Sequence, residues 1–100
     1  MKRNLIPFIC NDGFSMSVQA SETHHCQPRN DVGPYLSCEV GFPSEYTPEF
    51  AEYSEGDPED MTGGVCGWVP LEVVEAVIAR HGGLSVRAML NYRRNILPRY

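Results

Sequence analysis

Histidine and cysteine are the side chains of this 100-residue sequence that are best suited to bind a metal ion or act as a nucleophile. The densest group is Thr23-His24-His25-Cys26, which places two imidazoles beside a thiol. Structural zinc needs about four ligands in tetrahedral geometry, and Cys10 or Cys38 could complete the set only through folding, because no short ligand spacing is present. We interpret residues 23–26 as a loop with two solvent-facing histidines and a partly buried thiol, and we predict no metal and no other cofactor.

A cysteine–histidine nucleophilic pair is the second chemistry that these residue types allow. Cys26 or Cys66 could combine with any histidine, but a reactive thiolate needs a positively polarised, partly open site, and no feature of the sequence indicates one. His81 stands at the end of a predicted helix and is interpreted as a capping residue. Glu72 and Glu75 fall in the first turns of that helix, where carboxylates complement the helix dipole. We therefore predict no catalytic residue and no enzymatic activity.

The four cysteines are far apart and include no Cys-x-x-Cys pair: Cys10, Cys26, Cys38 and Cys66. Four cysteines allow three pairings, and nothing in the sequence selects one. The apolar run 5–10 is too short for the core of a signal peptide, and no run approaches the length of a membrane span. We predict free, mostly buried thiols and a cytoplasmic location.

The most informative stretch is both acidic and aromatic, and it contains no Lys or Arg. Carboxylates steer toward Lys/Arg-rich partners, and Tyr or Phe side chains add contact area that loses its water on binding. We predict a partner-binding surface outside the core, formed by Glu45, Tyr46, Glu49, Phe50, Glu52, Tyr53, Glu55, Asp57, Glu59 and Asp60. The alternative is a solvated loop that keeps a small protein soluble. Thr47 and Pro48 could begin a short helix within this stretch, as its cap and its first residue.

The charge distribution narrows the classes of partner. The net charge of −5 argues against a general nucleic-acid or membrane binder. After the acidic stretch the charge changes sign, because the sequence from Arg80 onward contains arginines and no acid: Arg87, Arg93, Arg94 and Arg99. This tail could contact phosphate, offset the acidic stretch within the molecule, or stay solvated. A small nucleic-acid-binding or metal-binding accessory protein is therefore the alternative function.

The elements that must position these residues begin with four strands, predicted at residues 5–10, 14–21, 35–42 and 65–69. Asn11-Asp12-Gly13 is typical of a hairpin turn between the first two strands. Pro7 assigns the first strand to an edge of the sheet or to a bulge, and Gly67 indicates a bulge or a close backbone approach in the fourth. Alternation predicts these core-facing side chains: Phe14, Met16, Val18, Ala20, Leu36, Cys38, Val40 and Phe42.

A central helix follows the fourth strand directly. Pro70 suits its first position, and Gly82-Gly83 supplies a left-handed stop. Its apolar stripe is Leu71, Val74, Val77, Ile78 and His81, widened by Val73. Ser85 can cap a second helix, in which Val86, Met89, Leu90 and Leu97 are expected to cover one side, with Tyr92 and Ile96 flanking it.

Together these elements predict an α+β fold. It is a small antiparallel sheet of about four strands, with the central helix packed on one face and a second, C-terminal helix. Residues 1–100 form one domain, in which residues 5–83 are the core and residues 84–100 are the C-terminal helix and basic tail.

Several segments together resemble small phage and prophage proteins without assigned activity. These segments are residues 12–21 (DGFSMSVQAS), 39–44 (EVGFPS), 67–70 (GWVP), 73–74 and 81–83. The resemblance covers most of residues 5–84 and transfers no functional residue.

In size, charge and general layout the chain is also similar to small anti-CRISPR proteins, although it shares no motif with them. This likeness implies a non-enzymatic phage product in the host cytoplasm. Such a product binds a basic surface of a bacterial defence complex, possible targets including a CRISPR–Cas effector, and blocks nucleic-acid access or nuclease recruitment.

Overall fold

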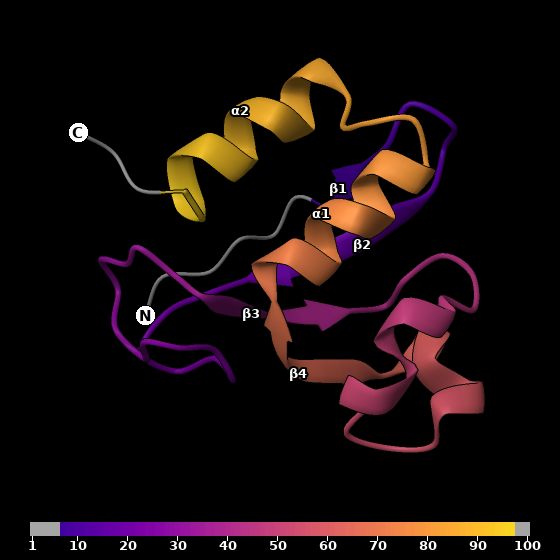
Figure 1. Ribbon diagram of the computed structural model, residues 1–100, viewed down its shortest axis with the longest axis horizontal. Coiled ribbons are helices and arrows are strands. Elements are labelled where there is room, and N and C mark those ends of the chain that lie inside the picture. Colours follow the sequence, from indigo (N-terminus) through magenta and orange to yellow (C-terminus); the bar gives the residue numbers. More distant parts are fainter. Residues whose placement is uncertain (1–6, 98–100) are drawn as a thin grey trace.

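The computed structural model describes residues 7–97 and folds them into an antiparallel four-stranded sheet with two α-helices (Figure 1). The strands lie in chain order: β1 (Phe8–Ile9), β2 (Ser15–Gln19), β3 (Ser37–Gly41) and β4 (Val65–Pro70). Two 3-10 helices, η1 (Pro48–Tyr53) and η2 (Pro58–Gly63), separate β3 from β4, and α1 (Leu71–Arg80) and α2 (Val86–Asn95) follow. The predicted α+β class with four strands is confirmed.

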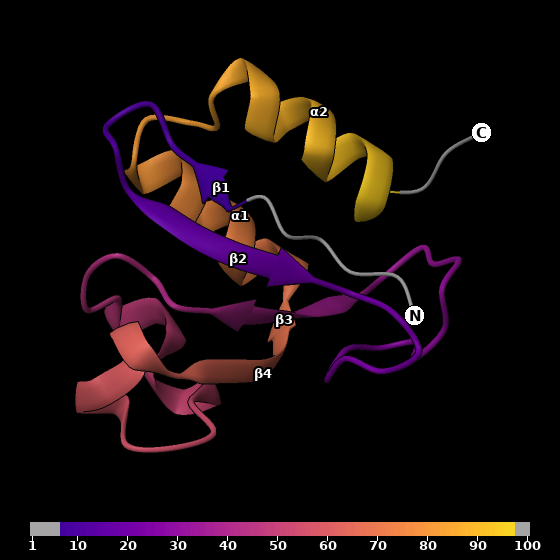
Figure 2. The ribbon, with the colours of Figure 1, turned by 180° about the vertical axis from the view of Figure 1, so that it is seen from behind.

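The β1–β2 hairpin forms where the sequence predicts it. Gly13 has a φ of +97°, and the Asp12 carboxylate accepts a hydrogen bond from the backbone N–H of Phe14 at 2.9 Å. Phe14, Met16 and Val18 are buried, whereas the serines between them are half-buried. Seen from behind, β2 runs in front of α1 (Figure 2). β1 lies at the edge of the sheet, as Pro7 predicts, while residues 5 and 6 of the predicted strand lie outside the described residues.

β3 is shorter than predicted, and this changes the position of both flanking side chains. Cys38 and Val40 are fully buried as expected, but Leu36 is 69% and Phe42 58% exposed. The strand starts after Leu36 and ends before Phe42, whose φ of +52° turns the chain out of the strand. Tyr35, which precedes the strand, is buried, and its hydroxyl donates to the Asn30 carbonyl at 2.7 Å. The strand therefore begins two residues later and ends one residue earlier than predicted.

The predicted irregularity at Gly67 is a β-bulge. Cys38 pairs with Val69 and Val40 with Cys66, so Gly67 and Trp68 together stand opposite one residue of β3. Trp68 has a φ of +51° and its side chain is 48% exposed. A left-handed backbone is unfavourable for a bulky residue, so this conformation must be held by its surroundings.

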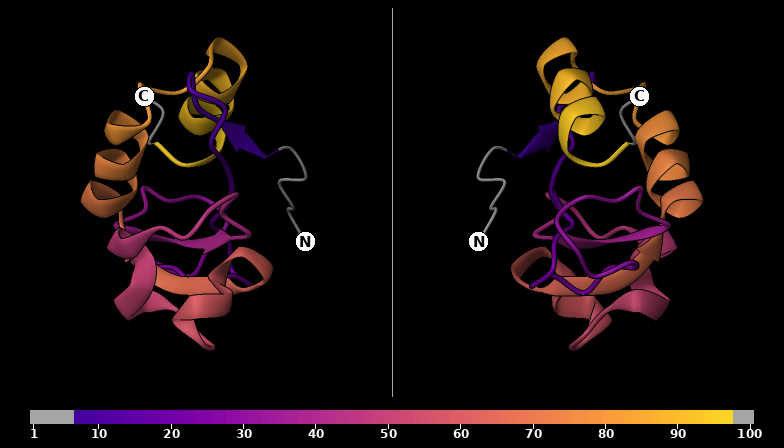
Figure 3. Two further views of the ribbon diagram at one scale, coloured as in Figure 1. Left: turned by 90° about the vertical axis from the view of Figure 1, so that its right-hand side faces the viewer. Right: turned by 90° about the vertical axis from the view of Figure 1, so that its left-hand side faces the viewer.

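α1 covers one face of the sheet, as the two side views show (Figure 3). Val74, Val77, Ile78 and His81 are buried as predicted, and Gly82 and Gly83 adopt φ values of +84° and +92° after the last turn. The helix begins one residue later than predicted, so Pro70 is its N-cap and not its first residue. Pro70 ends β4 in an extended conformation, and Leu71 is the first helical residue.

The buried face of α2 differs from the predicted one. Its buried residues are Ala88 and Tyr92, followed by the buried Ile96 at its C-cap, whereas Val86 and Leu90 are 81% and 61% exposed. The spacing of four residues selects this face, because Tyr92 packs edge-on against Phe8 with ring centroids 5.9 Å apart. Ser85 caps the helix as predicted, its hydroxyl accepting from the N–H of Ala88.

α2 therefore belongs to the same hydrophobic core as the sheet, and this core extends beyond residue 83 to Ala88, Tyr92 and Ile96. Arg99 of the basic tail lies outside the described residues. Within residues 7–97, no helix combines the length and the apolar composition needed to cross a membrane.

Candidate functional site

The acidic segment is anchored in the core, contrary to the prediction that it lies outside. Phe50 in η1 and Met61 in η2 are 0% and 1% exposed. The backbone N–H of Glu55 donates to the Val65 carbonyl of β4 at 2.9 Å, and the N–H of Thr47 points to the sulfur of Met61. Both short helices thus form a fixed platform beside β4 (Figure 1).

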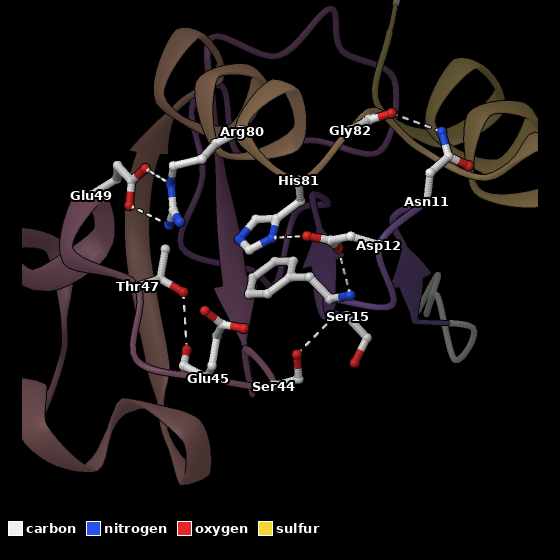
Figure 4. Close-up of polar contacts among 11 residues, drawn as sticks. Asn11, Asp12, Ser15, Ser44, Glu45, Thr47, Glu49, Arg80, His81 and Gly82 are labelled. Atoms are coloured by element: carbon white, nitrogen blue, oxygen red, sulfur yellow. Dashed lines mark hydrogen bonds and ion pairs between the residues drawn. The ribbon is translucent and has the colours of Figure 1, made fainter.

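The start of η1 agrees with the prediction in position but not in its contacts. Thr47 occupies the cap position and Pro48 the first helical residue. However, the Thr47 hydroxyl donates to the Glu45 carbonyl at 3.0 Å and does not cap the helix (Figure 4). In η2, by contrast, the Asp57 carboxylate accepts from the N–H of Glu59 at 2.9 Å.

Most of the predicted carboxylates reach solvent. The exposed acids of the segment, called here the acidic surface, are Glu45, Glu52, Glu55, Asp57, Glu59 and Asp60. Within residues 7–97 none of them forms an ion pair with Lys or Arg, since the only such pair involves Glu49. Apart from the electrostatic interaction of Glu45 with Arg80, these carboxylates have no Lys or Arg neighbour among the described residues that offsets their charge, and Glu55 is hydrogen-bonded to His25.

Glu49 differs from the other acids because its charge is already paired. The Arg80 guanidinium donates to both of its carboxylate oxygens, at 2.5 and 2.9 Å (Figure 4). This pair lowers the pKa of Glu49 and links η1 to the end of α1. Glu49 is therefore a structural contact and adds little free charge for a partner.

The aromatic residues divide into surface and core positions. Tyr46 is 50% exposed and Tyr53 is half-buried, so both reach the surface, but Phe50 is fully buried and cannot anchor a partner. Two exposed aromatics were missed by the sequence prediction, Phe42 and Trp68. Both have a positive φ, which alternation cannot reveal, although the neighbouring glycines Gly41 and Gly67 were a signal of irregular backbone.

The histidines and cysteine of residues 23–26 divide between two neighbours, because His24 and Cys26 contact Ser21 whereas His25 contacts Glu55. The His24 imidazole contacts the Ser21 hydroxyl at 2.6 Å, and the Cys26 thiol donates to the Ser21 carbonyl at 3.2 Å. Cys26 is fully buried and His24 and His25 are only half-exposed, so the predicted solvent-facing loop is more enclosed than expected. Residues 23–26 therefore do not form one ligand set.

His25 instead meets two glutamates from other elements. Its Nδ1 is hydrogen-bonded to the Glu55 carboxylate and lies 3.9 Å from the Glu39 carboxylate. The Trp68 indole stacks flat on the imidazole, with centroids 4.5 Å apart and an angle of 4° between the planes. In the described part of the chain this is the one group of three side chains whose ligand atoms could share a metal ion.

The thiols show none of the features of an activated nucleophile. All four are unpaired and buried, as predicted. Burial raises the pKa of the Cys26 and Cys66 thiols, and that of Cys38 to about 12. Since the thiolate is the reactive form, these groups are held in the unreactive one.

Asp12 and His81 form a carboxylate–imidazole pair like those that orient catalytic histidines. The distance between Asp12 Oδ2 and His81 Nδ1 is 2.7 Å (Figure 4). The Phe14 ring stacks on the imidazole with centroids 4.0 Å apart. His81 is 5% exposed, and its Nε2 is buried with no hydrogen-bond partner. Without a hydroxyl or thiol at Nε2, the pair joins the β1–β2 turn to the end of α1, consistent with the predicted capping position of His81.

Comparison of the chain with protein-family models, with curated proteins and with solved structures finds no match.

Proposed function

We propose that this protein is a non-enzymatic inhibitor of the phage type, acting in the host cytoplasm. Its acidic surface binds a basic surface of a bacterial defence complex that handles nucleic acid, and a CRISPR–Cas effector is the target class we favour. Binding occupies the surface that the nucleic acid or a recruited nuclease requires.

The observation that carries this proposal is the separation of charge in the molecule. The acidic surface lies beside β4, whereas α2, with the exposed Arg87, Arg93 and Arg94, lies at the opposite end (Figures 1 and 2). The arginines of α2 therefore do not offset the acidic surface by contact. Unpaired charge of one sign on one side attracts a partner of the opposite sign and speeds association.

Exposed aromatic side chains add a second reason to favour a protein partner. Tyr46 lies within the acidic surface, and Trp68 is connected to Glu55 through His25. Tyrosine and tryptophan are enriched among the interface residues that contribute most to binding free energy. Because the burial of Phe50 and Met61 fixes the platform, little conformational freedom is lost when a partner binds.

Inhibition then needs no chemistry in the bound complex. A protein that associates quickly and dissociates slowly keeps the nucleic-acid site occupied. The buried thiols and the enclosed His81 supply no alternative catalytic centre in the described residues.

The test is a competition assay with purified CRISPR–Cas effector complexes of several types, each loaded with its guide RNA. We expect the chain to prevent one of them from binding target DNA, at a chain concentration stoichiometric with the effector. The chain alone should neither bind nor cleave the DNA. Cleavage or modification of any component by the chain would contradict a non-enzymatic role, and target binding by every effector at excess chain would remove this target class.

α2 supports a second candidate, a nucleic-acid-binding accessory protein. Its exposed arginines have no ion pair within the described residues, and Val86 and Leu90 are exposed beside them. Direct binding of DNA or RNA that weakens steeply with salt would favour this candidate. The net charge of −5 opposes it, because phosphate repels the rest of the molecule.

A further inference from the structure

We propose that His25, Glu39 and Glu55 bind one divalent transition-metal ion of the zinc class. The three ligand atoms, one from each side chain, lie within 4.8 Å of one another. Ligand bonds to zinc of about 2.0–2.2 Å place ligand atoms roughly 3.4 Å apart in a tetrahedron. Small rotations of the two glutamate side chains close the difference. This site shares Glu55 with the acidic surface, but metal binding does not depend on the proposed partner binding, and it departs from the expectation of no metal.

The charge balance of the group favours a dication. Two carboxylates converge on one imidazole, and within residues 7–97 neither forms an ion pair with Lys or Arg. A protonated His25 supplies one positive charge, whereas a bound dication supplies two. The imidazole distinguishes the group from a purely acidic cluster, because nitrogen ligands suit zinc, nickel and copper, while calcium and magnesium prefer oxygen alone.

The backbone holds the ligands in place before an ion arrives. The backbone N–H of His25 donates to the Glu39 carboxylate at 2.9 Å, and the backbone carbonyl of His25 accepts from the backbone N–H of Trp68 at 2.8 Å. The stacked indole fixes the plane of the imidazole. Outer contacts of this kind orient metal ligands and strengthen binding.

Gly67 provides the space for the group. A side-chain carbon at this position would overlap the Glu55 carboxylate and lie 3.2 Å from the His25 Cβ. The bulge that places Gly67 and Trp68 opposite Glu39 therefore brings the three ligands together. The ligands remain reachable from solvent, since their side chains are 40%, 20% and 34% exposed for His25, Glu39 and Glu55.

Trp68 makes the site observable, because it is the single tryptophan of the chain and stacks on a proposed ligand. The full chain, stripped with a chelator and reduced, is titrated with zinc chloride while its fluorescence is recorded. We expect a saturable change at one ion per chain that excess chelator reverses. Glu39→Gln and Glu55→Gln should each weaken the apparent affinity about tenfold or more, and His25→Ala should abolish the response.

His24→Ala is the matched control, because His24 is the neighbouring imidazole and contacts Ser21 instead. It should bind zinc as the wild type does. Circular dichroism checks that each variant is folded, and a cobalt titration without thiolate-to-metal charge-transfer absorption separates this site from the cysteines. The proposal is overturned if the wild type shows no saturable response, if His24→Ala loses it equally, or if folded Glu39→Gln and Glu55→Gln retain full affinity. The last result leaves only a His25–Glu55 ion pair.

Discussion

Replacing Phe50 by alanine distinguishes between a role in partner binding at the surface and a role in the hydrophobic core. The sequence predicts a surface anchor for a partner, but the structure buries the whole side chain between η1 and the core. Removing a buried phenylalanine ring costs about 3–5 kcal/mol, from lost burial and from the cavity that remains. A domain of this size has a total unfolding free energy of roughly 5–15 kcal/mol, so this loss is a large fraction of it.

The assay is thermal and urea unfolding followed by circular dichroism, with Tyr46→Ala as the control. For a chain of this length the expected loss lowers the Tm of Phe50→Ala by about 12 °C or more. Tyr46 is half-exposed, and its replacement should change stability by about 0.5 kcal/mol or less. If the Tm and the free energy of unfolding of Phe50→Ala equal those of the wild type, Phe50 is not a core residue and the platform described for η1 is incorrect.

Two further predictions follow from the ionisable groups. Arg80→Ala should reduce stability at neutral pH, and the difference from the wild type should disappear on acidification. The lowered pKa of Glu49 makes the pair stabilising above the ordinary value of 4.5 and lost as the pH falls through the lowered one, which urea unfolding at several pH values measures. The four buried thiols should react slowly with a disulfide reagent in the native protein and all at once in denaturant, because burial raises their pKa; rapid native reaction of Cys38 would contradict its buried position.

Local sequence signals predicted most of the fold correctly. The Asn11-Asp12-Gly13 turn, the alternation along β2 and the stripe of α1 each describe a segment whose environment is uniform from end to end. Errors arose where the chain changes direction. Leu36 and Phe42 continue the β3 pattern in sequence, but the strand begins after Leu36 and ends before Phe42, so both side chains are exposed.

α2 shows why hydrophobicity alone could not select a buried face. Val86 and Leu90 are more apolar than Ala88, yet Ala88 lies in line with Tyr92 and Ile96, and Tyr92 finds both Phe8 and the Glu75 carboxylate. These partners come from distant parts of the sequence. Tertiary contact therefore outweighed the local pattern.

Composition identified the acidic segment, but it did not reveal which of its residues are buried in the core and which lie on the surface. The pairing of Glu49 with Arg80 spans 31 residues, and the meeting of His25 with Glu39 and Glu55 depends on a bulge that places Gly67 and Trp68 opposite Glu39. A single sequence contains no signal that residues so far apart along the chain come into contact in the fold.

The central claim is that the acidic surface binds a basic partner, and charge reversal within that surface tests it most directly. Glu52→Lys/Glu59→Lys changes two exposed acids without ion pairs, and Glu22→Lys/Glu72→Lys changes two exposed acids elsewhere. Each substitution adds two charges, so both variants shift from −5 to −1. The measurement is the association rate with the inhibited effector at low and at physiological salt. We predict that only Glu52→Lys/Glu59→Lys associates more slowly, and that salt slows the wild type more than this variant. Equal rates for the two variants would contradict the claim and place the interface elsewhere, with the arginines of α2 as the next surface to test.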